Sequence, residues 1–271
     1  MQFTVLTENR VRKRGLLAEH GLSLWIEHDG MCILFDTGQS DVYVRNAAAL
    51  GIDLKRADCI VLSHGHYDHC GGYPHFPGAQ PVTYVRRAAF APKFGRDSEG
   101  TRDIRIPWQP EGYPIQYTEE CTQIAPRAWL CSGIACTAPF ESLSPGLMTL
   151  SDGNLVTDPM TDEQVLVLET ERGLVLFIGC SHPGVVSCLQ HVQQRFPDKP
   201  LYALFAGMHL AGVKPERLDR TMDEFAACGL ARLFPVHCTG VEESCRMKAR
   251  FGSGCTLCQT GDTIVIESAF P

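Results

Sequence analysis

Three histidines and one aspartate fall within the segment HGHYDH, residues 64–69. Histidine accounts for only 10 of the 271 residues, so composition alone would produce such a cluster in about one chain in a thousand. Neutral imidazole and carboxylate groups suit zinc, iron and manganese. His64 and His66 are two residues apart on an extended loop, so their side chains can hold one ion from the same side. Asp68 and His69 can hold a second ion.

Two cations about 3.5–4 Å apart can share a hydroxide that is acidic enough to form at neutral pH and attack a substrate. Asp68 would then be a catalytic residue as well as a ligand. The alternative interpretation is a single structural metal or a polar turn, but structural zinc sites usually use cysteines and close all four positions. We therefore expect two divalent metal ions, with zinc as the first choice and manganese or iron as alternatives.

A short apolar strand predicted over residues 59–62 leads directly into this cluster. The carboxyl end of a strand is where open α/β sheets bind ligands. Further strands are predicted over residues 2–7, 21–27 and 31–35. The turn His28-Asp29-Gly30 predicts a hairpin between the last two of these. A helix is predicted over residues 40–50, with Ser40 as N-cap and Gly51 as C-cap.

The last 110 residues alternate between strand and helix patterns. Strands are predicted over residues 164–169, 173–179, 200–206, 232–236 and 263–267, and helices over 184–195 and 215–228. This order indicates a largely parallel sheet covered by helices. Between the two regular parts, residues 85–148 are rich in proline and aromatic residues. We interpret them as a loop-rich excursion, either a hairpin layer or a wall over the active site.

Composition narrows the classes of partner. The net charge is −7, and the only short basic cluster spans Arg10 to Arg14, so a nucleic-acid partner is not expected. No apolar run approaches the ~20 residues of a membrane helix, and the N-terminal segment lacks the pattern of a signal peptide. Thirteen cysteines in such a chain indicate reduced thiols and a cytoplasmic location. The partner that remains is a small-molecule substrate.

Four motifs occur in the order typical of the metallo-β-lactamase superfamily, which this chain resembles over nearly its whole length. They are FDTGQS at 35–40, LSHGHYDHCGG at 62–72, GCSHPG at 179–184 and PVHCTG at 235–240. Together with EHGLS at 19–23, they resemble the branch of dihydropterin-methyl-ribofuranosylaminobenzene-phosphate synthase-like proteins. The resemblance implies an α/β (α+β) fold, a four-layer αββα sandwich that forms a single domain over residues 1–271.

The resemblance also implies a set of metal ligands. The HxHxDH signature of the superfamily matches His64, His66, Asp68 and His69. The histidine near the end of the chain that completes the superfamily's second metal site matches His237. Cys180 stands where the superfamily often has a bridging aspartate, and the GCSH pattern implies His182 as the replacement ligand. Cys180 itself is either a thiolate ligand or a small buried group.

The superfamily's middle histidine has no counterpart in residues 149–163, where Asp162 is one candidate substitute. His209 follows the strand predicted over 200–206, so we assign it a catalytic or substrate-contacting role, with an additional ligand or a packed side chain as alternatives. His20 either supports a ligand or makes a hairpin hydrogen bond. Asp36 either orients a ligand histidine or caps the N–H groups of its own turn.

Four cysteines crowd into the C-terminal region and include one CxxC pair. They are Cys238, Cys245, Cys255 and Cys258. A separate metal and a redox dithiol are both conceivable, but the spacings favour reduced structural thiols.

These patterns predict a metal-dependent hydrolase or transferase that uses water activated at a dinuclear centre on a small substrate. The resemblance favours a phosphorylated or pterin-like molecule as the substrate. Two alternatives from other classes are a di-iron redox protein and a non-catalytic metal-binding sensor. The sequence specifies neither the substrate nor the oligomeric state.

Overall fold

The computed structural model describes residues 1–266 and divides the chain into two compact units. Unit 1 comprises Met1–Glu119, Ser144–Asp162 and Gln259–Ile266, and unit 2 comprises Glu120–Leu143 and Glu163–Cys258. Helices and three sheets form a mixed α/β structure. The assignment of residues 1–271 to a single domain remains a prediction. No helix within residues 1–266 is both long and apolar enough to cross a membrane.

Unit 1 is built on a seven-stranded sheet with the order β17-β1-β2-β3-β4-β5-β8. Its strands are β1 (Gln2–Thr7), β2 (Ser23–His28), β3 (Met31–Phe35), β4 (Cys59–Val61), β5 (Thr83–Val85), β8 (Ile115–Tyr117) and β17 (Thr263–Val265). The pairs from β17 to β3 are antiparallel, and those from β3 to β8 are parallel. Of the strand predicted over 263–267, residue 267 lies outside the described residues. The predicted hairpin is confirmed, because Asp29 and Gly30 both have positive φ and join β2 to β3.

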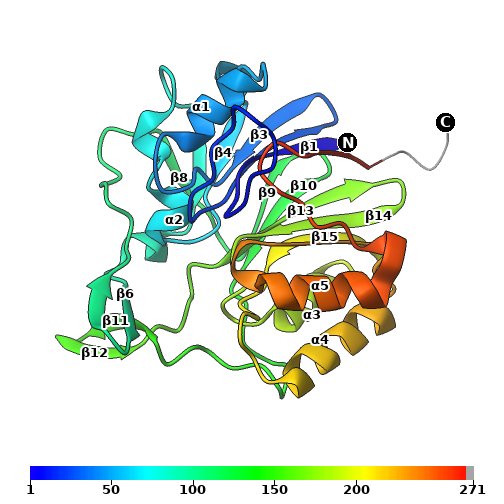
Figure 1. Cartoon of the computed structure of the whole chain (residues 1–271). Helices are drawn as coiled ribbons and strands as arrows, with labels where there is room; N and C mark the ends of the chain where they lie inside the picture. Colours follow the sequence, from blue (N-terminus) through cyan, green and yellow to red (C-terminus); the bar gives the residue numbers. More distant parts are fainter. Residues whose placement is uncertain (267–271) are drawn as a thin grey trace. The chain divides into compact units, whose positions relative to one another are not determined.

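The helix α1 (Val42–Ala49) packs against this sheet (Figure 1). It buries Tyr43 and Ala47 in the same apolar cluster as Leu34 of β3 and Ile60 of β4. The prediction of Ser40 as N-cap is wrong by one residue, since the capping position is Asp41. The Ser40 hydroxyl still accepts the Val42 N–H at 3.3 Å, which explains why the sequence pointed to it.

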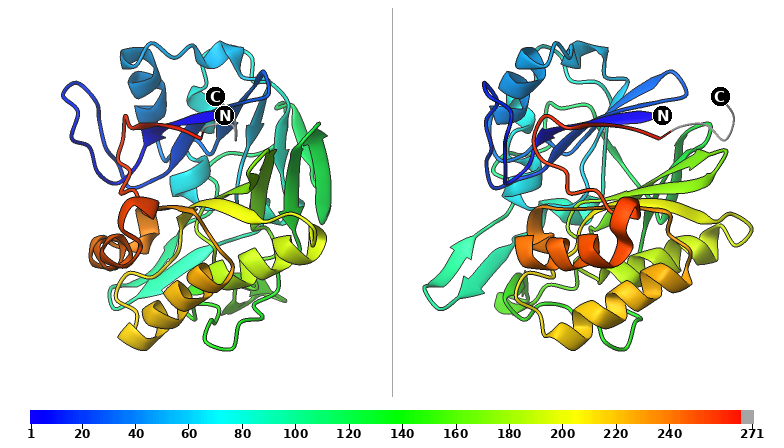
Figure 2. Two further views of the ribbon diagram at one scale, coloured as in Figure 1. Left: turned by 90° about the vertical axis from the view of Figure 1, so that its right-hand side faces the viewer. Right: turned by 45° about the vertical axis from the view of Figure 1, so that its right-hand side comes forward.

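A small antiparallel sheet with the order β12-β11-β6-β7 also belongs to unit 1. Its strands are β6 (Phe94–Asp97), β7 (Gly100–Asp103), β11 (Leu147–Ser151) and β12 (Asn154–Thr157), and Figure 2 shows β6 and β7 as a projecting hairpin. Residues 85–148, predicted to be a loop-rich excursion, consist of short strands joined by loops and supply strands to all three sheets.

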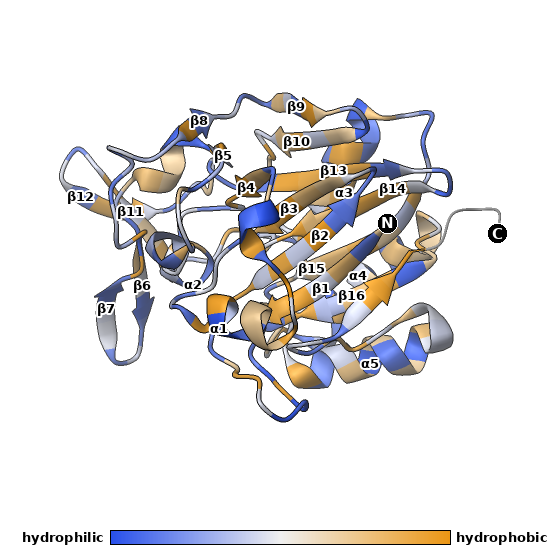
Figure 3. Ribbon diagram, turned by 90° about the horizontal axis from the view of Figure 1, so that it is seen from above, coloured by the Kyte–Doolittle hydropathy of each residue, from blue (hydrophilic) through white to orange (hydrophobic). Residues whose placement is uncertain are grey.

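Unit 2 is built on a six-stranded sheet with the order β16-β15-β14-β13-β10-β9. The strands are β9 (Cys121–Ala125), β10 (Ala128–Ser132), β13 (Gln164–Thr170), β14 (Gly173–Ile178), β15 (Leu201–Gly207) and β16 (Arg232–Val236). The neighbours β14, β15 and β16 are parallel, as the alternation of strands and helices predicts. Figure 3 shows β13 and β16 as largely apolar, which is typical of strands buried on both faces.

Three helices of unit 2 cover one face of this sheet (Figure 1): α3 (Val185–Arg195), α4 (Pro215–Ala227) and α5 (Val241–Phe251). Leu176 of β14, Val186 of α3, Phe225 of α4 and Met247 of α5 share one apolar core. The helices predicted over 184–195 and 215–228 are confirmed to within one residue. The helix α5 was not predicted, because its buried positions include Glu243 and Ser244 and leave a weak apolar stripe.

Candidate metal centre

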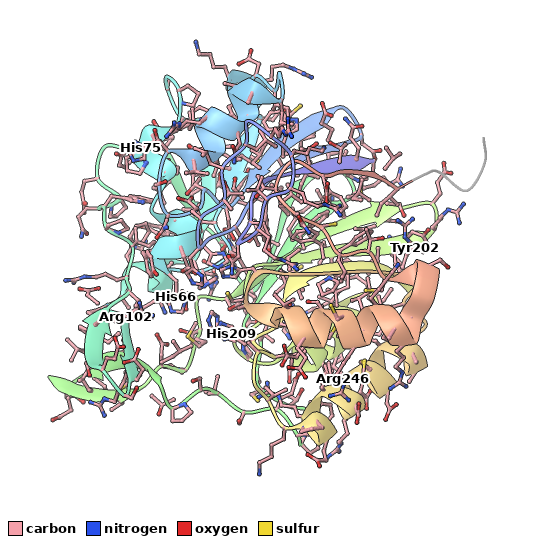
Figure 4. The ribbon with its side chains drawn as sticks, viewed as in Figure 1. His66, His75, Arg102, Tyr202, His209 and Arg246 are labelled. Carbon is pink, nitrogen blue, oxygen red and sulfur yellow. The ribbon has the colours of Figure 1, made fainter. Side chains whose placement is uncertain are left out.

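In unit 1, the loop after β4 brings two imidazole nitrogens close together. His64 Nε2 lies 3.0 Å from His66 Nδ1, and both side chains are buried. Figure 4 labels His66, which immediately precedes the short helix α2 (Tyr67–Cys70). Two nitrogens bound to one tetrahedral zinc at ~2.0–2.1 Å would be about 3.3 Å apart. The pair therefore has close to the spacing of two ligands on one cation.

A buried carboxylate orients the third histidine of the cluster. Asp36, directly after β3, has a positive φ of 56° and accepts the Ser63 N–H and the Ser63 hydroxyl, each at 2.7 Å. Its Oδ2 atom also lies 2.7 Å from His69 Nδ1. Burial raises the pKa of Asp36, and His69 and Ser63 oppose that rise. The N–H groups that follow Asp36 in its turn have other acceptors: Thr37 N–H donates to the His69 carbonyl and Gly38 N–H to the Leu22 carbonyl. The interpretation of Asp36 as a cap of its own turn is therefore wrong.

Asp68 lies in the first turn of α2 and is only 7% exposed. Its Oδ2 atom is 3.8 Å from His69 Nε2 and 3.3 Å from His20 Nε2. The His20 ring is half exposed and so connects the carboxylate to solvent. His20 thus contacts a predicted ligand, as one of its two interpretations requires.

Glycines around the cluster allow backbone segments to approach closely. A Cβ on Gly65 would lie 2.0 Å from the Ala89 carbonyl oxygen, and one on Gly72 would lie 2.1 Å from that of Thr37. Gly65 does not have a positive φ, so it is required for this approach and not for a left-handed turn.

A buried ion cluster is also bonded to this loop. Asp162 Oδ2 accepts the Gly65 N–H at 2.7 Å, and its Oδ1 pairs with Lys93 Nζ at 2.9 Å. Lys93 also pairs with Asp158 at 2.8 Å. Burial alone would lower the pKa of Lys93, but the two carboxylates outweigh it and raise the pKa. Both oxygens of Asp162 therefore have protein partners, which accounts for its burial without a role as a substitute ligand.

Replacing Lys93 with methionine is expected to destabilise the protein by about 3–5 kcal/mol, because two buried carboxylates would lose their counter-ion. Urea unfolding followed by circular dichroism measures this loss. Lys55→Met is the control, since Lys55 is exposed and its replacement should stay within about 0.5 kcal/mol. Equal midpoints for the two variants would contradict the prediction.

In unit 2, a second buried carboxylate orients a histidine in the same way. Glu163, directly before β13, accepts the Ser181 N–H at 2.9 Å and lies 2.7 Å from His182 Nδ1. Both Glu163 and His182 are buried. Histidine ligands commonly donate one ring N–H to a carboxylate, which leaves the other nitrogen to the metal. Ser181 adopts a φ of 51°, which turns the chain sharply between Cys180 and His182.

Donor atoms from the ends of β14, β15 and β16 gather in unit 2. Cys180, His237 and Cys238 form one group whose donor atoms all lie within 4.8 Å of one another, and Cys180, His182 and His209 form another. The sulfurs of Cys180 and Cys238 are 3.4 Å apart. Burial would raise the pKa of Cys238, but its contact with Cys180 and the nearby His209 and His237 hold that pKa well below its usual value.

His209 follows β15 and is exposed, with a φ of 45°. Its ring, labelled in Figure 4, lies 4.6 Å from that of His182, centroid to centroid. An exposed imidazole beside a buried one can exchange protons with solvent. The alternative interpretation of His209 as a packed side chain is therefore wrong. The role of His209 towards a substrate stays a prediction.

The late cysteines do not gather around a metal of their own. Cys238 lies against Cys180, whereas Cys245 is exposed and Cys255 and Cys258 are buried. Within residues 1–266, no group of neighbouring ligand atoms includes Cys245, Cys255 or Cys258. All thirteen cysteines lie within residues 1–266 and are in the thiol form.

Three features around the site were not predicted from the sequence: the burial of Lys93, the contact of Cys238 with Cys180, and the pairing of Glu163 with His182. A signal for Glu163 existed, because only three residues separate the strands predicted over 164–169 and 173–179. Pairing of these strands as a hairpin brings residue 163 to the same end as residue 180. In the observed register Leu166 pairs with Phe177, which confirms that arrangement. Lys93 carried no such signal, since it lies 69 residues from Asp162.

Comparison with known proteins places these motifs in context. A model of the family described as the metallo-beta-lactamase superfamily matches residues 17–194. The 7,8-dihydropterin-6-methyl-4-(beta-D-ribofuranosyl)-aminobenzene-5'-phosphate synthase of Methanocaldococcus jannaschii is 29% identical over 242 residues, which cover 82% of each chain. An uncharacterized protein of the same organism is 29% identical over 244 residues, covering 87% of this chain and 90% of its own.

A solved structure is similar along the whole chain. It is described as a metal-dependent hydrolase of the beta-lactamase superfamily, and it has a TM-score of 0.86 and 27% sequence identity. The similarity covers 99% of this chain and 100% of the other.

Proposed function

Because the chain belongs to the metallo-β-lactamase superfamily, we propose that it is a metal-dependent hydrolase or transferase with two divalent metal ions. The fold class predicted from the sequence, an α/β fold of the metallo-β-lactamase type, is confirmed. The observation that carries the proposal is the histidine cluster after β4, in which His64 Nε2 and His66 Nδ1 lie 3.0 Å apart.

The donor groups in each unit suit divalent metals. Unit 1 offers His64, His66, Asp68 and His69, and unit 2 offers His182 and His237. Asp36 and Glu163 each bond to Nδ1 of one histidine at 2.7 Å. Such carboxylates fix the tautomer and raise the basicity of the nitrogen opposite. The proposal assigns the six residues to one dinuclear centre, as the family resemblance implies.

When bound, the ions would supply an activated water and polarise the electrophilic centre of the substrate. Asp68 contributes negative charge beside His69 and can take a proton, which His20 can pass to solvent because its ring is half exposed. His209, also exposed, is the residue we propose to donate a proton to the leaving group.

One relative supports a proposal for the substrate class. The chain is 29% identical to a synthase whose name includes a pterin and a phosphate ester, so a small phosphorylated or pterin-like molecule is the first candidate. The net charge of −7 does not oppose an anionic substrate when cations occupy the centre. We propose that residues 85–148, with their aromatic side chains, contact the organic part of the substrate.

Removal of metal tests the proposal. The purified protein is expected to contain close to two divalent ions per chain and to hydrolyse one member of a panel of phosphomonoesters, phosphodiesters, thioesters and lactones. Dialysis against a chelator should abolish that activity, and zinc should restore it. Elemental analysis and steady-state rates are the measurements.

The outcomes separate the proposal from its two rivals. Tightly bound iron with a visible absorption band that changes on reduction would favour a di-iron redox protein. A fully metal-loaded protein that is inert on every class of ester would favour a metal-binding sensor. Activity that survives complete removal of metal would overturn the proposed function.

A further inference from the structure

The thiol of Cys238 lies close to Cys180 and to the proposed metal ligand His237. Cys238 is not among the six residues proposed above as metal ligands. We propose that Cys238 binds metal as a thiolate together with Cys180, so that unit 2 offers a mixed sulfur and nitrogen donor set. This inference rests on the proposed function, because it concerns the same metal centre.

The positions of the two sulfurs support a shared ion. Cys180 follows β14 and Cys238 follows β16, so two separate loops bring their sulfurs to 3.4 Å. Two thiolates on one tetrahedral zinc at ~2.3 Å would be about 3.8 Å apart. A disulfide would require about 2.05 Å. The observed spacing is therefore nearer to that of two ligands than to that of a bond.

The Cys238 sulfur has a hydrogen-bond donor beside it, and a neighbouring glycine leaves space for it. The backbone N–H of His209 donates to Cys238 Sγ at 3.3 Å. A Cβ on Gly207 would lie only 2.8 Å from the same sulfur, so the absence of a side chain there makes room for it. Amide donors to sulfur are a common feature of metal-bound thiolates, whose electron density they tune.

One neighbouring imidazole, that of His237, belongs to the same group of donor atoms. Cys180, Cys238 and His237 already have their donor atoms within 4.8 Å of one another, which is compact enough for a common cation. Thiolate and imidazole together select zinc or ferrous iron over magnesium and manganese. We therefore expect the metal bound in unit 2 to be a thiophilic divalent ion.

Cobalt substitution tests the inference directly. The metal-free full-length protein loaded with Co²⁺ is expected to show a thiolate-to-cobalt charge-transfer band in the near ultraviolet. Cys238→Ser should lower the intensity of this band by about half, since one of two thiolates remains. Cys245→Ser is the control, because Cys245 is exposed on α5 and should leave the band unchanged. Bound cobalt is counted in every sample.

The possible results are distinct. Bound cobalt without a charge-transfer band, or a full band in Cys238→Ser, would overturn the inference while leaving the metal centre intact. Failure of the wild-type protein to bind cobalt would overturn the proposed function and this inference together. A second measurement uses only the wild-type chain, so it does not depend on how a variant folds. Zinc should protect Cys238 from alkylation, as mapped by mass spectrometry, while Cys245 reacts equally with and without zinc.

Discussion

Asp68→Ala is expected to lower the metal content towards one ion per chain and to reduce any hydrolytic rate at least about a hundredfold. Asp68 is the only carboxylate in the HGHYDH segment. It is 7% exposed and lies 3.8 Å from His69 Nε2. Its removal takes away a proposed ligand and the negative charge next to the position where water would be activated. Elemental analysis and kcat on the best substrate of the panel measure the two effects.

Two further variants make the result for Asp68 specific. Asp68→Asn keeps the shape and removes the charge, so it should lose almost as much activity as the alanine variant if the charge matters. Asp97→Ala is the matched control, because Asp97 is exposed in β6 and should retain full metal and full rate. Undiminished activity in Asp68→Ala would show that the two-metal chemistry is wrong.

The part of the candidate site that could be predicted from sequence is the part made by local contacts. His64 and His66 are separated by one residue, so a single loop conformation brings their nitrogens to 3.0 Å. The carboxyl end of β4 was also predictable, because a short apolar run precedes the cluster. Asp36 was ambiguous, since its partner His69 lies 33 residues away, and only the parallel pairing of β3 with β4 brings the two loops together.

The remainder depends on contacts that no local pattern encodes. Lys93 is buried because two aspartates more than sixty residues away surround its ammonium group. A lysine in a loop of unknown course is more often exposed. Cys238 was grouped with later cysteines by proximity in sequence, but its sulfur meets Cys180, 58 residues earlier. Strand order in the unit 2 sheet decides that contact, and strand order was not predicted.

Glu163→Gln is expected to weaken zinc binding by about tenfold to a hundredfold. The Glu163 carboxylate takes hydrogen bonds from the Ser181 N–H and lies 2.7 Å from His182 Nδ1. An ionised carboxylate only accepts, so it keeps the proton on Nδ1 and the lone pair on Nε2. If the glutamine amide nitrogen faces His182, the ring must move its proton to Nε2, which then cannot bind metal. If it faces Ser181 instead, two donors oppose each other in a buried position.

Glu141→Gln separates this effect from a simple loss of stability. Glu141 is also a buried glutamate of unit 2, and it accepts the N–H groups of Val186 and Ser187 at 2.9 and 2.8 Å at the start of α3. Its replacement should lower the melting temperature without changing zinc affinity, because none of these hydrogen bonds involves a histidine. Competition with a chromophoric chelator measures the affinity, and nitrogen chemical shifts of the His182 ring report its tautomer. Equal zinc affinity in Glu163→Gln and wild type, with Nδ1 still protonated, would show that Glu163 merely braces the turn at Ser181.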